Sequence, residues 1–168
     1  MKGVDAIEHT ASPFHFNAKD PQELIVPAVA GTGSILQSAL KNGNDTVKRV
    51  VVTSSVAAIM LPVTSPRIFT ENDWNEASIQ EVETLGTAAA SGSMYRASKT
   101  LAERAAWKFV ENNRDKLNWD LTVINPPFVF GPVLHEVAKP EALNTSMLEW
   151  YNVAVKGTKT DEELVQTG

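Results

Sequence analysis

The sequence predicts an α/β fold with a parallel sheet and helices on both faces. Short apolar segments of strand length occur at residues 4–10, 47–53 and 119–125. Two segments with apolar residues at helical spacing, 20–42 and 94–110, alternate with them. This alternation is typical of parallel strands joined by right-handed crossovers. Since ligands bind beyond the carboxyl ends of such strands, we expect the functional residues there.

Each predicted element has its own signal in the sequence. The first strand lies between Gly3 and the turn at Ser12 and Pro13. The segment 20–42 forms one helix or two, because Pro27 must begin or kink a helix. The segment 47–53 is a β-branched run, which predicts a strand buried on both faces.

The middle and the end of the chain are less regular. Residues 54–92 contain two prolines and several glycines and serines, so we predict a long loop there, which is usually a functional feature. Its acidic residues are expected to form a solvated face: Glu71, Asp73, Glu76, Glu81 and Glu83. After Gly131 only residues 143–155 suggest a helical period.

Composition excludes several classes of function. A chain of 168 residues with 43% hydrophobic content fits one core, and a net charge of −5 with scattered basic residues disfavours nucleic acid and anionic membranes as partners. The absence of cysteine excludes disulfides and zinc–thiolate sites. No apolar run approaches the roughly 20 residues of a membrane span, and the start shows no secretion signal. We therefore expect a cytoplasmic protein.

One pair of residues suggests catalysis. Tyr95 and Lys99 are four residues apart on a predicted helix, so their side chains share a face. A nearby ammonium lowers the pKa of a phenol, which lets Tyr95 act as a general acid toward a carbonyl oxygen. Ser55, at the end of the preceding strand, can hold the same oxygen. The spacing alone is also compatible with purely structural residues, and the strand ends around it favour the catalytic interpretation.

Four segments together resemble a known family. They are HTASPFHF (9–16), VKRVVVTSSVAAI (47–59), MYRASKTLAERAAWKFVENN (94–113) and VINPPFVFGP (123–132). They are similar to the extended short-chain dehydrogenases/reductases, in the dihydroflavonol reductase-like branch that includes fungal aldehyde, ketone and methylglyoxal reductases. The resemblance covers roughly residues 3–135 and implies a partial NAD(P)-binding Rossmann fold.

The resemblance also implies roles for individual residues. It makes Ser55, Tyr95 and Lys99 the catalytic trio, and it places Phe14 and Val56 in the substrate pocket. The implied cofactor is NADP, used as NADPH, with NAD as an open alternative. The residues that the resemblance assigns to cofactor binding are Ala11, Ser12, Pro13, Thr53, Tyr95, Lys99 and Pro126.

The sequence departs from the family at its start. The family opens with a strand, a glycine-rich phosphate turn and a helix, and nothing of this kind precedes Val4. Gly31 and Gly33 lie within a predicted helix, where small residues serve close helix contacts. We therefore expect a piece truncated at both ends, with a partial Rossmann domain lacking its N-terminal strands over 1–135 and the start of a substrate-binding region over 136–168.

These observations predict a function with open alternatives. The main hypothesis is hydride transfer from NADPH to a small aldehyde or ketone. The alternatives are an extended short-chain epimerase, dehydratase or hydroxysteroid dehydrogenase, or a non-catalytic remnant. Alone, the chain is expected to show no measurable reductase activity and to self-associate through the exposed edge of its first strand. No metal is expected, because His9, His15 and His135 fit no ligand spacing.

Overall fold

The structure is a computed structural model that describes residues 3–15 and 17–166, so Phe16 of the 9–16 segment lies outside the described residues. The chain forms two compact units, Met1–Pro127 and Phe128–Gly168, and each is described by itself. The division falls after Pro127, a few residues before the boundary expected at 135.

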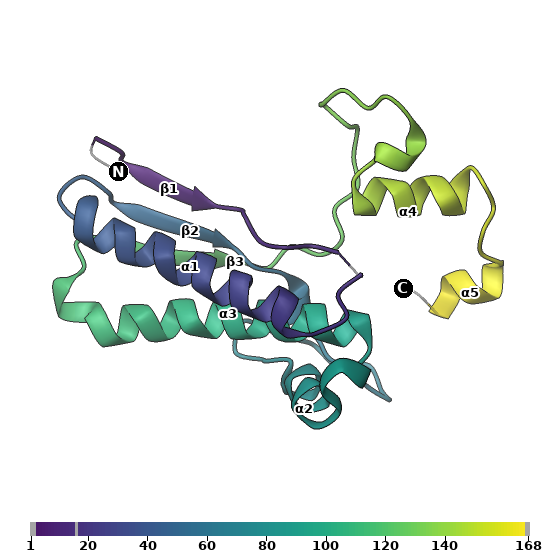
Figure 1. Cartoon of the computed structure of the whole chain (residues 1–168), viewed down its shortest axis with the longest axis horizontal. Helices are drawn as coiled ribbons and strands as arrows, with labels where there is room; N and C mark the ends of the chain where they lie inside the picture. The colour runs from purple at the N-terminus through teal and green to yellow at the C-terminus, as the bar shows by residue number, and fades with distance from the viewer. Residues whose placement is uncertain (1–2, 16, 167–168) are drawn as a thin grey trace. The chain divides into compact units, whose positions relative to one another are not determined.

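The first unit contains a parallel sheet of three strands, as predicted. They are β1 (Ala6–His9), β2 (Arg49–Thr53) and β3 (Asp120–Ile124), in the order β1-β2-β3 (Figure 1). The register pairs Ile7 with Val50 and Val50 with Leu121. β1 is therefore an edge strand of the sheet that the structure describes.

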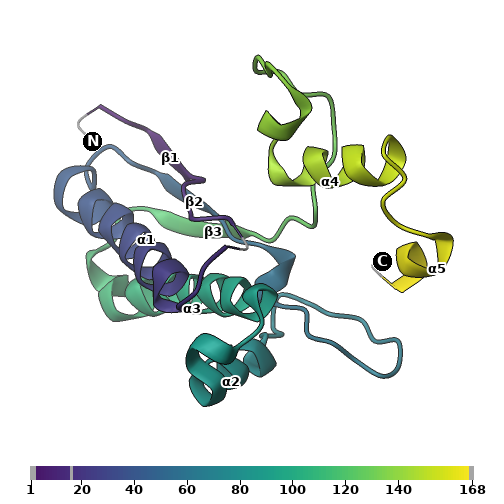
Figure 2. The same cartoon turned by 45° about the vertical axis from the view of Figure 1, so that its right-hand side comes forward.

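Two long helices cover one face of this sheet. They are α1 (Gln22–Asn42) and α3 (Ser91–Asn113), which lie side by side in both views (Figures 1 and 2). Val50 and Val52 are buried beneath them, whereas Glu8, Thr122 and Ile124 on the other face are exposed. Among the described residues, helices therefore cover one face of the sheet, whereas the sequence predicted helices on both faces. Val51, on the other face, is half-buried, so β2 is not fully buried on both faces.

α1 is a single continuous helix. Pro27 lies inside it on an exposed position, so it neither starts nor divides the helix. The buried side of α1 is a stripe at helical spacing, formed by Leu24, Ala28, Thr32, Leu36 and Ala39. Among the described helices, α1 alone is long and apolar enough to cross a membrane. Core helices of soluble proteins also meet this criterion, and the buried stripe of α1 faces the core.

The prediction of a loop over residues 54–92 was wrong for its second half. This part contains α2 (Glu76–Leu85), whose Ile79 and Val82 join a core cluster with Leu24 and Met94. Asn75 caps α2 by accepting from the Ser78 N–H at 3.1 Å. The helix is only ten residues long and turns little apolar surface inward, so its period in the sequence is weak.

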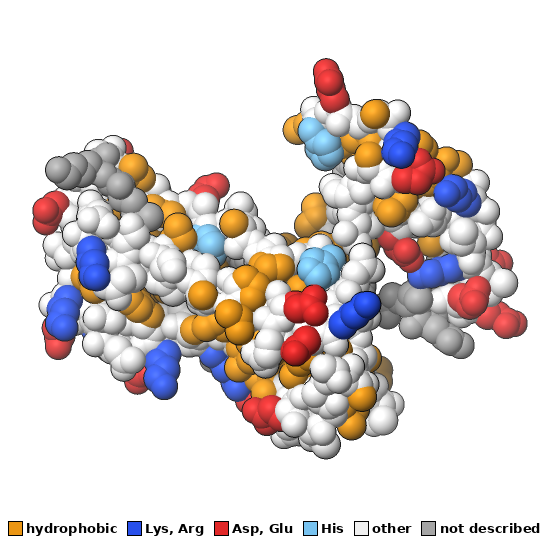
Figure 3. All heavy atoms as spheres, viewed as in Figure 1, with side chains coloured by type: hydrophobic (Ala, Val, Ile, Leu, Met, Phe, Trp, Pro, Cys, Tyr) orange, Lys and Arg blue, Asp and Glu red, His pale blue; other side chains and the backbone are white. Residues whose placement is uncertain are grey.

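The acidic residues of this segment are also more than a solvated face. Glu76 forms an ion pair with Arg104 of α3, and Glu81 accepts from the Ser93 hydroxyl at 2.7 Å. Lysine and arginine side chains are scattered over the face shown in Figure 3, and they form no continuous basic patch on it.

The second unit contains α4 (Thr145–Ala154) and α5 (Asp161–Gln166). α4 corresponds to the weak period seen at 143–155, and Asn144 caps it by accepting from the Met147 N–H at 3.0 Å. None of the side chains described between residues 128 and 163 is buried, and Leu134 is 98% exposed. This unit therefore forms no apolar core of its own in the described residues.

Candidate active site

Ser55 lies just beyond the end of β2 and is held by backbone contacts on both sides. The Ser54 N–H donates to the Ile124 carbonyl at 2.8 Å, and the Val56 N–H donates to the Pro126 carbonyl at 3.0 Å. Ser55 itself begins the short 3-10 turn Val56–Ala58, where its hydroxyl oxygen accepts from the Ala57 N–H at 3.1 Å. The pairing of β2 with β3 thus continues past the strands and carries Ser55.

Tyr95, near the start of α3, approaches Ser55 as expected. A hydrogen bond between the two side chains favours the phenolate form of Tyr95, but burial has the larger effect and raises the pKa of Tyr95 above 10. The expectation that Lys99 lowers this pKa was wrong in its net direction. Phe14 packs on the phenol, with ring centroids 4.8 Å apart.

Lys99 lies one helical turn after Tyr95 and is buried. Its ammonium donates to the Thr53 carbonyl oxygen at 3.2 Å, at the end of β2. Burial lowers the pKa of Lys99, and the negative charge of Glu103 opposes this shift. The site therefore contains a buried cation within reach of a strand end, a phenol and a serine hydroxyl.

Two further residues at this site were missed by the sequence analysis. Glu103 is buried one turn beyond Lys99, and it accepts from the amide nitrogen of Asn125 at 2.7 Å. Asn125 follows β3 and also donates to the Ser55 carbonyl at 3.0 Å. The signal for Glu103 was the repeated step of four along α3 from Tyr95 through Lys99, and the signal for Asn125 was its position at a strand end.

A small hollow of about 10 Å³ adjoins Lys99. It is lined by residues at or just after the ends of β1 and β2, including His9, Ala11, Ser12, Thr53 and Ser54. The hydroxyl oxygens of Ser12 and Ser54 are buried without a hydrogen-bond partner among the described residues. Unsatisfied hydroxyls beside an ammonium can make polar contacts with a hydroxylated ligand.

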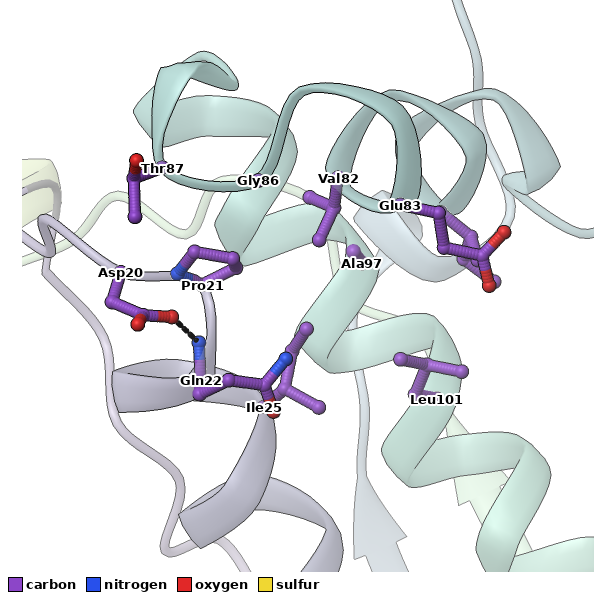
Figure 4. Close-up of a pocket in the computed structure, with 11 residues that line it drawn as sticks. Asp20, Pro21, Gln22, Ile25, Val82, Glu83, Gly86, Thr87, Ala97 and Leu101 are labelled. Carbon is purple, nitrogen blue, oxygen red and sulfur yellow. Dashed lines mark hydrogen bonds between the residues drawn. The ribbon is translucent and has the colours of Figure 1, made fainter.

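A larger hollow of about 420 Å³ lies elsewhere, between α1, α2 and α3. Figure 4 shows Ile25, Val82, Ala97 and Leu101 around it, with Asp20 at its rim accepting from the Gln22 N–H at 2.8 Å. Ala97 lies two residues from both Tyr95 and Lys99, which places it on the opposite side of α3. This hollow is therefore separate from the candidate active site.

The chain matches known proteins over most of its length. The sequence profile of NAD-binding family 4, described as male sterility protein, matches residues 1–160. The chain belongs to this family. The relatives below and a dihydroflavonol 4-reductase of Arabidopsis thaliana, 34% identical over 148 residues, place it in the extended short-chain dehydrogenase/reductase group and its dihydroflavonol reductase-like branch.

Two curated relatives illustrate the similarity. A ketoreductase of Aspergillus niger is 46% identical over 152 residues, which cover 87% of this chain and 41% of the relative. The NADPH-dependent methylglyoxal reductase of Saccharomyces cerevisiae is 40% identical over 149 residues, covering 86% and 42% of the two chains. The chain thus spans about two fifths of the length of these relatives.

Solved structures confirm the partial Rossmann fold. The yeast methylglyoxal/isovaleraldehyde reductase complexed with NADPH superposes with a TM-score of 0.71 at 40% identity, over 80% of this chain and 39% of that chain. An NADPH complex of a Candida albicans homologue gives a TM-score of 0.73 at 41% identity, over 85% and 41%. The three parallel strands and their helices therefore have the fold of NADPH-bound reductases.

Proposed function

We propose that the protein containing this chain is an NADPH-dependent reductase of small aldehydes or ketones, with Ser55, Tyr95 and Lys99 as its catalytic residues. The observation that carries the proposal is the convergence of these three side chains at the end of β2, where Ser55 bonds to Tyr95 and Lys99 to Thr53. The named activities of the relatives support it, since they include a ketoreductase and methylglyoxal reductases.

The proposed reaction needs a proton for the carbonyl oxygen, and Tyr95 is suited to supply it. Because burial raises the pKa of Tyr95, the phenol is fully protonated at neutral pH and begins as an acid. Ser55, whose oxygen is held by the Ala57 N–H, would turn its hydrogen from Tyr95 to the same carbonyl oxygen when a substrate is bound. Lys99 stabilises the negative charge that Tyr95 gains as the proton leaves.

The cofactor supplies the hydride when it is bound. The residues that would hold it are Ala11, Ser12, Pro13, Thr53, Lys99 and Pro126, together with the phenol of Tyr95. The unsatisfied hydroxyls of Ser12 and Ser54 support this assignment, because a buried hydroxyl without a partner costs free energy until a ligand satisfies it. NADPH is favoured over NADH, since the relatives and their structures are named for NADPH.

Phe14 and Val56 are proposed to contact the substrate. Phe14 is 39% exposed although its ring packs on Tyr95, so it offers apolar surface beside the proton donor. Val56 begins the turn after Ser55 and is half-buried. This surface favours carbonyl compounds that carry an apolar group.

The test is the Tyr95→Phe variant of the full-length protein, with Tyr151→Phe as a matched control. NADPH-dependent reduction of methylglyoxal or an aryl aldehyde should fall by about 10²- to 10⁴-fold in Tyr95→Phe, since a general acid is lost. NADPH affinity, measured by fluorescence, should change little, because the Tyr95 phenol is one of several proposed cofactor contacts, and Tyr151→Phe should bind NADPH like the parent. A Tyr95→Phe enzyme with a near-normal rate would exclude the mechanism.

We further propose that the isolated chain self-associates through β1 and that the full-length enzyme works in the cytoplasm. β1 is an edge strand of the described sheet, and exposed edges pair readily with a second copy. Light scattering across a concentration series should show association that Ala6→Lys, at an exposed position of β1, weakens, and a monodisperse monomer would contradict this. Cell fractionation of the full-length protein tests the compartment.

A further inference from the structure

Glu103 is a buried carboxylate that the proposed proton transfer does not use. Only 5% of the residue is exposed, and it lies on α3 one turn beyond Lys99. One carboxylate oxygen accepts from Asn125 at 2.7 Å, and the other accepts from the indole N–H of Trp107 at 3.4 Å. Because burying an ionised carboxylate is costly unless it is paired, its partners indicate what it does.

The first link runs through Asn125 to Ser55. The amide nitrogen of Asn125 has two hydrogens, and it donates to the Glu103 carboxylate and to the Ser55 carbonyl, the latter at 3.0 Å. Glu103 therefore orients the amide that fixes the backbone of the serine. The link joins α3 to the ends of β2 and β3.

The second link is electrostatic and runs to Lys99. The titratable groups that face Lys99 among the described residues are Glu103 from α3 and His9 from β1. Tyr95 shares the same side of α3 at a four-residue step, and Thr53 of β2 contributes a carbonyl oxygen. Burial of Lys99 favours its neutral form, and the charge of Glu103 opposes that tendency. Burial, and secondly the charge of Lys99, lower the pKa of His9, so this lowered pKa disfavours a second positive charge beside Lys99.

We propose that Glu103 is a positioning residue of this site: its carboxylate fixes the Ser55 backbone through Asn125, and its charge keeps Lys99 an ammonium next to Tyr95. The consequence for catalysis rests on the proposed reductase function. The arrangement of Glu103, Asn125 and Lys99 does not rest on that function, because these contacts are present in the chain without a cofactor.

The first test measures the pH midpoint of the Lys99 titration in the chain without cofactor. Competitive amine labelling with mass spectrometry monitors the titration. Glu103→Gln keeps an oxygen that accepts from Asn125, and it removes the charge together with the longer contact from the Trp107 indole. The midpoint of Lys99 should move to lower pH in this variant. Glu111→Gln changes an exposed residue of the same helix, roughly 18 Å from Lys99 along the helix axis, and should leave the Lys99 midpoint unchanged. An unchanged Lys99 midpoint in Glu103→Gln would overturn the proposal.

The second test uses the pH profile of kcat in the full-length enzyme. In Glu103→Gln the alkaline fall of kcat should begin at lower pH, and activity should recover toward the parent as the pH is lowered and Lys99 regains its proton. The loss should be smaller than the about 10²- to 10⁴-fold expected from removal of the proton donor. A loss of equal size at every pH would overturn the electrostatic part. If the parent lacks reductase activity, the proposed function fails while the Lys99 titration still tests Glu103.

Discussion

The ammonium of Lys99 lies 3.2 Å from the carbonyl oxygen of Thr53, which joins α3 to the end of β2. A hydrogen bond of this kind is modest in water, but here the ammonium is buried and its pKa is lowered. The folded chain therefore bears a cost for holding this charge, and a cost of this kind usually marks a functional residue.

Replacing Lys99 should separate activity from stability. In the full-length protein Lys99→Met should abolish carbonyl reduction and weaken NADPH binding, unlike Tyr95→Phe. The free energy of unfolding at neutral pH should change little, because the loss of a costly buried charge offsets the loss of the Thr53 and Glu103 contacts. Enzyme assays and urea unfolding measure the two effects, with exposed Lys108→Met as the control. A strongly destabilised Lys99→Met protein would show that the ammonium mainly supports the fold.

Two buried serines should respond oppositely to alanine. The Ser54 hydroxyl has no partner among the described residues, so Ser54→Ala should leave stability unchanged or raise it, and should weaken NADPH binding by the full-length enzyme. The Ser93 hydroxyl donates to Glu81 at 2.7 Å, so Ser93→Ala should cost about 1–3 kcal/mol of unfolding free energy and leave NADPH affinity intact. Equal losses of stability in both variants would contradict the assignment of Ser54.

His9 should make the stability of the chain depend on pH. Burial, and secondly the charge of Lys99, lower the pKa of His9 below 6.5. As the pH falls, His9 is protonated in the unfolded chain before it is protonated in the folded chain. The free energy of unfolding therefore decreases as the pH drops below about 6.5, and this decrease stops below the pKa of His9 in the folded chain. Urea unfolding between about pH 5 and pH 8 should show a smaller pH dependence in His9→Gln than in the parent or in exposed His15→Gln.

Asn75 should be a strong structural contributor. It is fully buried, caps α2, and donates to the carbonyls of Ala57 at 3.1 Å and Met60 at 2.6 Å. Asn75→Ala removes the cap and leaves two carbonyls unsatisfied, so we expect a loss of roughly 2–4 kcal/mol in unfolding free energy. Exposed Asn72→Ala should change it little. Chemical denaturation compares the two, and equal values would show that the cap contributes nothing specific.

The sequence predicted the parts of the fold that carry strong periodic signals. The three parallel strands, α1, α3 and the approach of Tyr95 to Ser55 follow from periodicity, spacing and strand ends. The sequence did not reveal α2, because its buried stripe is short and joins a core cluster that includes the distant residues Leu24 and Met94.

Other features of the site depend on three-dimensional neighbours. The direction of the Tyr95 shift is decided by burial, which no local spacing reveals. Glu103 was missed because a glutamate on a helix is usually exposed, and its burial depends on partners that include Asn125, 22 residues away in sequence.

The continuation of the β2–β3 pairing past the strands has a practical consequence. Because the amides of Ser54 and Val56 are held by carbonyls of the neighbouring segment, Ser55 does not depend on the exposed stretch 62–68 for its place. That stretch can be lengthened, shortened or exchanged between homologues while the serine stays fixed. It is therefore a natural insertion point that leaves the position of the serine unchanged.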